Sequence, residues 1–140
     1  MIIERLDLKA FGRFTDTSIE LPEGPRRLHI IYGPNESGKS TSLRAITSLL
    51  YGMSKRAEDN YIHPTGKIRV GGKLSDGNGN VLECLRRRGN KATLRDADDN
   101  ETIDDAVLEA MLGGVDREAF EHRFGLSHEE LVRGGQAILE

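Results

Sequence analysis

The sequence lacks the features that would place a chain outside the cytosol or in a membrane. Cys84 is the only cysteine among 140 residues, which excludes an internal disulfide and favours a reducing compartment. Charges interrupt every apolar run near the N-terminus, so no signal-peptide core is present. No apolar segment approaches the length of a membrane span. We therefore expect a soluble cytoplasmic protein without membrane contacts.

A strong charge of one sign is also missing. The net charge is −3, so there is no general attraction to nucleic acid or to an anionic membrane, and DNA contact would require a local patch. Hydrophobic residues make up 36% of the chain and charged residues 31%. These fractions indicate a well-solvated surface, or one of which part meets a partner. The length suits one domain or a piece of one.

Residues 1–56 are predicted to hold three strands and a helix. Ile2–Phe11 alternates between apolar and polar residues, which is typical of a half-buried strand, and Thr15–Leu21 indicates a second one. Leu28–Tyr32 is a short apolar run that suits a strand buried on both faces. After a glycine-rich loop, helical spacing continues as far as Gly52. The apolar face of this helix comprises Leu43, Ile46, Leu49, Leu50 and Met53.

Residues 57–100 are predicted to form a loop and an antiparallel meander, and residues 101–140 a helical segment. Asp76–Gly79 is a hairpin turn between two strand-like runs. Thr102 with Asp105 fits a capping box, and Asp116 is expected to cap the next helix. Ser127 with its following acidic residue fits a third cap. The 101–140 segment is therefore expected to hold several short helices.

The glycine-rich loop Gly33–Thr41 matches the full P-loop pattern G-x-x-x-x-G-K-[ST]. Glycines let successive backbone N–H groups point at phosphate oxygens, and the helix start adds unpaired N–H groups and the positive end of its dipole. Lys39 should carry charge to the β- and γ-phosphates and to the transition state, Ser40 should bind Mg²⁺, and Thr41 can reach the α-phosphate. The predicted nucleotide-binding residues are Gly33, Asn35, Glu36, Ser37, Gly38, Lys39, Ser40 and Thr41.

The segment Pro34–Thr41 resembles the P-loop of ATPases of the SMC, RecF and RecN type. In that group the motif also comes early, after a strand–Phe–strand opening like Leu8–Phe14. The chain resembles in particular the YhaN-like ATPases, over nearly all of its length. Further segments that carry this resemblance are Ile31–Glu36, Val70–Gly72, Leu112–Arg117, Phe124–Glu129 and Gly134–Leu139.

This resemblance implies an α/β fold of the P-loop NTPase class, with residues 1–140 as the N-terminal lobe of an SMC/ABC-type head. In such a head a coiled coil follows, and a C-terminal segment supplies the Walker B acids and the signature motif. Two heads enclose two ATP molecules with Mg²⁺, as a homodimer. The family further implies DNA repair or chromosome maintenance, with DNA and a nuclease subunit as possible partners. The sequence ends inside the run Gln136–Leu139 without a helix stop, which suggests that the natural chain continues.

Catalytic groups beyond Lys39 are poorly represented. No apolar run ends in a Walker B acid, and Thr102–Asp105 is better explained as an acidic helix start. Leu131–Gln136 imitates the ABC signature but has an extra residue and lacks its serine, so a helix break is favoured. The chain alone is therefore expected to hydrolyse ATP poorly.

Three further positions are candidates through the resemblance. His128 or Gln136 could occupy the Q-loop position, which touches Mg²⁺ and the attacking water; a surface position in a capped helix remains the alternative for His128. Arg13 follows the first strand and is a candidate contact to the γ-phosphate or the base.

Basic and acidic clusters have plainer explanations. The basic residues of 86–95 could touch DNA phosphates, although a solvated face is the commoner outcome. Asp96, Asp98 and Asn100 imitate the start of an EF-hand, but the glycine and the bidentate glutamate are absent, so a polar turn is predicted. The basic residues in question are Arg86, Arg88, Lys91 and Arg95.

Two other functions stay open on the sequence. A stand-alone P-loop kinase or GTPase would need a downstream acid or a guanine-recognition element, and neither is visible. The early pair of strands and the meander also differ from the strand–helix alternation of a kinase. A non-hydrolysing, nucleotide-gated interaction module is the second alternative, since ATP can act as dimerisation glue in the related heads.

Overall fold

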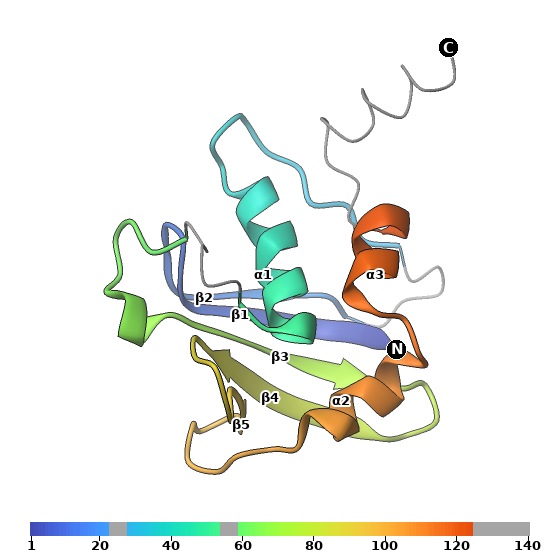
Figure 1. Ribbon diagram of the computed structural model, residues 1–140. Coiled ribbons are helices and arrows are strands. Elements are labelled where there is room, and N and C mark those ends of the chain that lie inside the picture. The colour runs from blue at the N-terminus through green and yellow to red at the C-terminus, as the bar shows by residue number, and fades with distance from the viewer. Residues whose placement is uncertain (23–27, 54–58, 125–140) are drawn as a thin grey trace, which may run out of the picture.

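A five-stranded antiparallel sheet forms the framework of the computed structural model, which describes residues 1–22, 28–53 and 59–124. The strand order is β2-β1-β3-β4-β5, and helix α1 crosses one face of the sheet (Figure 1). The chain is thus a mixed α/β protein, as predicted. The strands are β1 (Ile2–Phe11), β2 (Phe14–Glu20), β3 (Arg69–Ser75), β4 (Val81–Arg87) and β5 (Leu94–Asp96). The helices are α1 (Lys39–Tyr51), the short 3₁₀ helix η1 (Thr65–Lys67), α2 (Asp105–Leu112) and α3 (Arg117–Arg123).

The period-two pattern of β1 places apolar and charged side chains on opposite faces of the sheet. Leu6 and Leu8 are buried in the core shared with α1, while Arg5 and Asp7 form an ion pair at 3.0 Å on the other face. The bounds predicted for β1 are confirmed, and β2 begins one residue earlier than predicted. Most of the core comes from the sheet and α1. Its buried members are Leu6, Leu8, Phe11, Ala45, Leu49, Leu50, Ile68, Val70, Leu74, Cys84, Leu94 and Leu108.

The β3–β4 hairpin confirms the predicted turn at residues 76–79. The Asp76 carboxylate accepts hydrogen bonds from the backbone N–H of Asn78 at 2.7 Å and of Asn80 at 3.2 Å. These bonds satisfy donors that the hairpin ladder leaves unpaired at its end. The meander is therefore closed by local side-chain chemistry that the sequence already indicates.

Helices α2 and α3 follow the sheet and lie near the C-terminal end of α1 (Figure 1). The prediction that Thr102 caps the first of them is wrong. Asp104 is the N-cap, accepting from the N–H of Ala106 at 2.9 Å, while Thr102 pairs with β5 in an isolated bridge to Arg95. The competing strand pairing takes Thr102 out of capping position. Asp116 caps α3 as predicted.

The predicted strand Leu28–Tyr32 is absent, because nothing in the described part of the chain pairs with it. Leu28 and Ile30 are each 74% exposed and Tyr32 is 89% exposed. Within residues 1–22, 28–53 and 59–124, no backbone hydrogen bond to this run is found. A strand needs a hydrogen-bonded neighbour, and an apolar one also needs cover on its faces.

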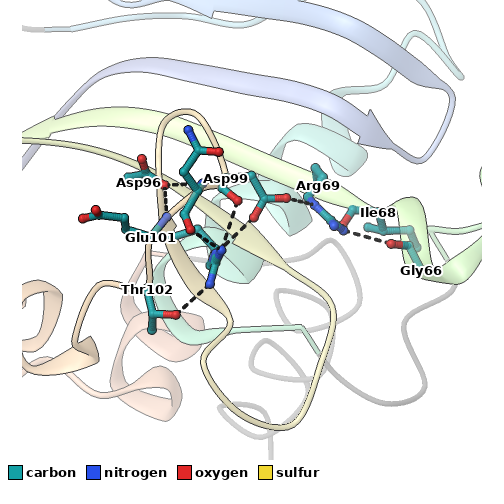
Figure 2. A network of polar contacts seen from close by, with 9 residues as sticks. Gly66, Ile68, Arg69, Asp96, Asp99, Glu101 and Thr102 are labelled. Carbon is teal, nitrogen blue, oxygen red and sulfur yellow. Dashed lines mark hydrogen bonds and ion pairs between the residues drawn. The ribbon is translucent and has the colours of Figure 1, made fainter.

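The polar turn after β5 is held by two arginines (Figure 2). Arg69 and Arg95 donate to the two carboxylate oxygens of Asp99, at 2.9 and 3.2 Å. Asp96 accepts from the N–H groups of Asn100 and Glu101. These side-chain bonds form the polar turn that the sequence predicts at Asp96–Asn100.

Several predictions fall on residues outside the described ranges. These are the cap at Ser127, the signature-like run 131–136 and the two Q-loop candidates, His128 and Gln136. Among the helices that the structure does describe, none combines the length and apolar character needed to cross a membrane.

Candidate nucleotide-binding site

The glycine-rich loop joins residue 32 to α1 and ends in a left-handed turn. Glu36 has φ +64° and Gly38 has φ +102°, so the chain curls before α1 begins at Lys39. Gly38 is required here for a second reason: a Cβ on it would collide with the Phe14 ring. No side chain caps the start of α1, and its first turn carries no acidic residue. The positive end of the helix dipole therefore faces the loop without a neutralising side chain.

Lys39 reaches back over the loop. Its Nζ donates to the carbonyl oxygens of Gly33 and Pro34, both at 2.7 Å. The side chain is exposed, as is that of the following Ser40, whereas Thr41 is buried. The loop thus presents one ammonium and one hydroxyl group to solvent at the start of α1. Such a pair suits a polyphosphate and its metal ion.

The β1–β2 hairpin covers one side of the loop. Arg13, at the tip of the hairpin, donates from Nη1 to the carbonyl of Glu36, and Phe14 packs its ring on Gly38. The sequence placed Arg13 near the nucleotide only through a family resemblance. The structure brings the residue against the loop and leaves its side chain exposed.

A second support comes from the segment after α1, for which the sequence predicts only a polar loop. Arg44 on α1 donates to both oxygens of Asp59, at 3.0 Å from Nε and 2.6 Å from Nη2, and Asp59 is only 4% exposed. The carbonyl of Asp59 accepts from the N–H of Gly12 at 2.9 Å. Asp59 thereby ties α1 to the hairpin. A buried aspartate in a polar run has no period or motif, so only the tertiary structure reveals it.

These elements enclose an open cleft of about 620 Å³ beside the loop. It brings together most of the residues predicted from the motif, adds Arg13 and includes one residue that was not predicted, Tyr61. Gly33 and Ser37 belong to the loop but do not line the cleft. The lining residues are Arg13, Asn35, Glu36, Gly38, Lys39, Ser40, Thr41 and Tyr61.

The possible DNA-binding role of Arg86 is not supported by its position. Arg86 is 3% exposed and donates to the carbonyl oxygens of Leu49 and Leu50 at 3.1 and 3.4 Å. It also forms an ion pair with Asp105. Arg95 is likewise engaged, with Asp99 and Thr102. The alternation of faces along β4 put Arg86 inside, so the hypothesis of a basic patch containing it is wrong.

Comparison with known proteins places these observations in a family context. Residues 1–140 match a family described as AAA domain. The chain is also similar to a protein from Methanopyrus kandleri described as DNA double-strand break repair Rad50 ATPase. The two are 29% identical over 155 residues, covering 99% of this chain and 17% of the relative. The chain therefore spans about a sixth of the length of the curated relative that it matches.

Proposed function

We propose that this chain, which belongs to the AAA domain family, binds ATP with Mg²⁺ at its glycine-rich loop, which acts as a P-loop. The observation that carries the proposal is the geometry of the loop. Residues with positive φ precede an uncapped helix start, and Lys39 and Ser40 are exposed beside a cleft. This arrangement offers backbone N–H groups, a helix dipole and a cation to a polyphosphate.

Each predicted residue has a distinct task in this proposal. The backbone N–H groups of residues 35–38 hold phosphate oxygens, with Asn35, Glu36 and Ser37 forming the middle of the loop, whereas Pro34 has no N–H to offer. Lys39 carries charge to the β- and γ-phosphates, in exchange for its bonds to the loop carbonyls. Ser40 gives its hydroxyl to Mg²⁺, which neutralises phosphate charge and orients the phosphates. Thr41 lies at the α-phosphate end.

The larger context of the site is an SMC-type head, in the manner of the YhaN-like ATPases. The exposed apolar run Leu28–Tyr32 leads directly into the loop and has no backbone hydrogen-bond partner in the described part of the chain. A second head segment would supply that partner together with the Walker B acid and the signature motif. The length of the Rad50-type relative supports a head assembled from more than these residues.

We further propose a cellular process for the complete protein. Two such heads would dimerise around ATP, and the complete protein would act on DNA in the cytoplasm, in repair or chromosome maintenance. This extension rests on the similarity to the Rad50 ATPase. A nuclease partner remains part of the same hypothesis. The antiparallel sheet argues against a stand-alone P-loop kinase, in which strands and helices usually alternate around a parallel sheet.

The proposal is tested by titrating the 140-residue chain with ATP in the presence of Mg²⁺ by isothermal calorimetry. Lys39→Ala should weaken binding about 10- to 100-fold, since it removes a charge-assisted contact to phosphate. Lys91→Ala is the matched control, because Lys91 is exposed in the β4–β5 connection, outside the cleft. Equal affinity of the wild type and Lys39→Ala, or no binding by the wild type, would contradict the proposed function.

A further inference from the structure

An exposed aromatic ring lines the cleft beside the glycine-rich loop. Tyr61 is 61% exposed. It is the one aromatic residue among the described residues that line this cleft. Among the described residues, none forms a hydrogen bond with its hydroxyl and no ring stacks on it. A tyrosine that served packing would bury its ring against apolar neighbours. The ring is therefore available on the side of the cleft.

Tyr61 lies at the Thr41 end of the loop. The two side chains converge on Gly12: a Cβ on Gly12 would lie 2.6 Å from Thr41 Cγ2 and 3.3 Å from the Tyr61 hydroxyl. In a P-loop the lysine serves the β- and γ-phosphates, and the residue two positions later is at the α-phosphate. The nucleoside is attached at the α-phosphate. Tyr61 thus lies at the end of the cleft where a nucleoside would extend from the phosphate chain.

The backbone on both sides of Tyr61 is fixed. On one side, Asp59 accepts from Arg44 and from the N–H of Gly12. On the other side, His63 donates from Nε2 to the carbonyl of Phe14 at 2.8 Å. Both anchors lead to the β1–β2 hairpin, which also covers the loop. The ring is exposed, but its point of attachment is held relative to α1 and the loop, which reduces the entropy lost when a ligand orders it.

We propose that Tyr61 stacks on the base of the bound nucleotide, so that the cleft selects a nucleoside triphosphate over a bare polyphosphate. This inference rests on the proposed function, because it assumes that the loop holds the phosphates. Stacking between an aromatic side chain and a base needs no hydrogen bond and favours the larger purine surface. Tyr61 would then be a specificity residue, distinct from the groups that hold phosphate and metal.

The first experiment compares ATP with inorganic tripolyphosphate, each with Mg²⁺, on the 140-residue chain. Tyr61→Ala should weaken ATP binding on the order of tenfold and leave tripolyphosphate binding unchanged. Tyr61→Phe keeps the ring and should retain the affinity for ATP. An unchanged ATP affinity in Tyr61→Ala, or an equal loss for both ligands, would overturn the inference while leaving the P-loop proposal intact. Failure of the wild type to bind either ligand would overturn both.

A second experiment reads the contact directly. The chain contains no tryptophan, so Tyr61→Trp introduces a single tryptophan at the proposed stacking position, and its emission can be excited apart from that of the remaining tyrosines. ATP should quench and shift its emission, and tripolyphosphate should not. Ile62→Trp is the matched control, since Ile62 is the adjacent residue, is 54% exposed and does not line the cleft. The same response to ATP at both positions, or to both ligands at residue 61, would refute stacking.

Discussion

At the scale of single residues, Arg86 on β4 makes the buried polar contacts that join α1, β4 and α2. Its guanidinium is buried and donates to the carbonyls of Leu49 and Leu50 at the end of α1, to Thr93, and to Asp105 at the start of α2. Carbonyls in the last turn of a helix have no partner within the helix, so a buried cation is well placed there. One side chain thus connects α1, β4 and α2.

Arg86→Met should lower the free energy of unfolding by about 2–3 kcal/mol, because it leaves buried carbonyls without donors and Asp105 without its cation. Urea denaturation followed by circular dichroism measures this change. Arg87→Met is the control, since the side chain of Arg87 alternates to the other face of β4 and is partly exposed. It should cost no more than about 0.5 kcal/mol. Similar losses for both variants would show that the buried contacts are not the cause.

Cys84 lies in the core on β4, and its thiol is expected to make stability depend on alkaline pH. Burial raises the pKa of Cys84 from 9.0 to about 11, opposed in part by the charge of Arg86. The folded state therefore keeps a proton that the unfolded state loses. The contribution is fully present below pH 9 and is lost as the pH rises through about 11. At pH 10 the loss is about 1.4 kcal/mol.

Other groups also titrate in this range, so the prediction concerns the difference between the wild type and Cys84→Ala. The free energy of unfolding, measured in urea at pH 8, 9 and 10, should fall more steeply for the wild type. The gap between the two proteins should narrow by about 1.4 kcal/mol between pH 8 and pH 10. Parallel curves would mean that the thiol titrates alike in the folded and unfolded states.

At the level of elements, the approach of α1 to β3 depends on Gly72. A Cβ at this position would lie 2.6 Å from the carbonyl oxygen of Arg5 on β1 and 3.0 Å from Leu49 Cδ2 on α1. Because a backbone atom on one side cannot move away, Gly72→Ala should destabilise the protein by about 1–3 kcal/mol through overpacking.

Gly66→Ala is the matched control for this change, because nothing lies within 4 Å of a Cβ at Gly66. It should alter the free energy of unfolding by no more than about 0.5 kcal/mol. Thermal unfolding of the two variants and the wild type compares them directly. A stable Gly72→Ala protein would show that α1 and β1 can separate without cost, contrary to the packing described above.

The elements that could be predicted are those whose signals are local. β1 follows from period-two alternation, and the β3–β4 turn follows from Asp76 and the glycines beside it. The elements that were mispredicted depend on distant partners. Thr102 has the chemistry of a cap, but pairing with Arg95 places it in a bridge instead. Leu28–Tyr32 has the composition of a buried strand, yet composition does not supply the neighbour that a strand needs.

At the scale of the whole molecule, the residues of the candidate site also divide into those with a local sequence signal and those brought together by the fold. Residues 33–41 are contiguous, so a motif could predict them. The surrounding support comes from the hairpin at Gly12–Phe14 and from the segment that carries Asp59 and Tyr61, which the fold alone brings to the loop. No periodicity marks such residues, because their spacing is set by tertiary contacts. The motif therefore predicted the loop side of the cleft and missed the side that carries Tyr61.

The exposed run Leu28–Tyr32 is expected to become a buried strand when the proposed second head segment is present. Ile30 is 74% exposed, so Ile30→Glu should change the free energy of unfolding of the 140-residue chain by no more than about 0.5 kcal/mol. In a protein that carries both proposed head segments, the same change would bury a charge in a central strand. We expect it there to abolish assembly of the head, measured by size-exclusion chromatography with ATP.

Val81→Glu is the matched control, because Val81 is 53% exposed on β4 and lies outside the run. It should leave both the chain and the assembled head intact. If Ile30→Glu destabilises the short chain by several kcal/mol, the run is already packed there and needs no second segment. If neither variant affects the assembled head, this run is not the strand that the second segment covers. The two substitutions therefore distinguish a run that remains an exposed loop from one that becomes a strand of the sheet in the assembled head.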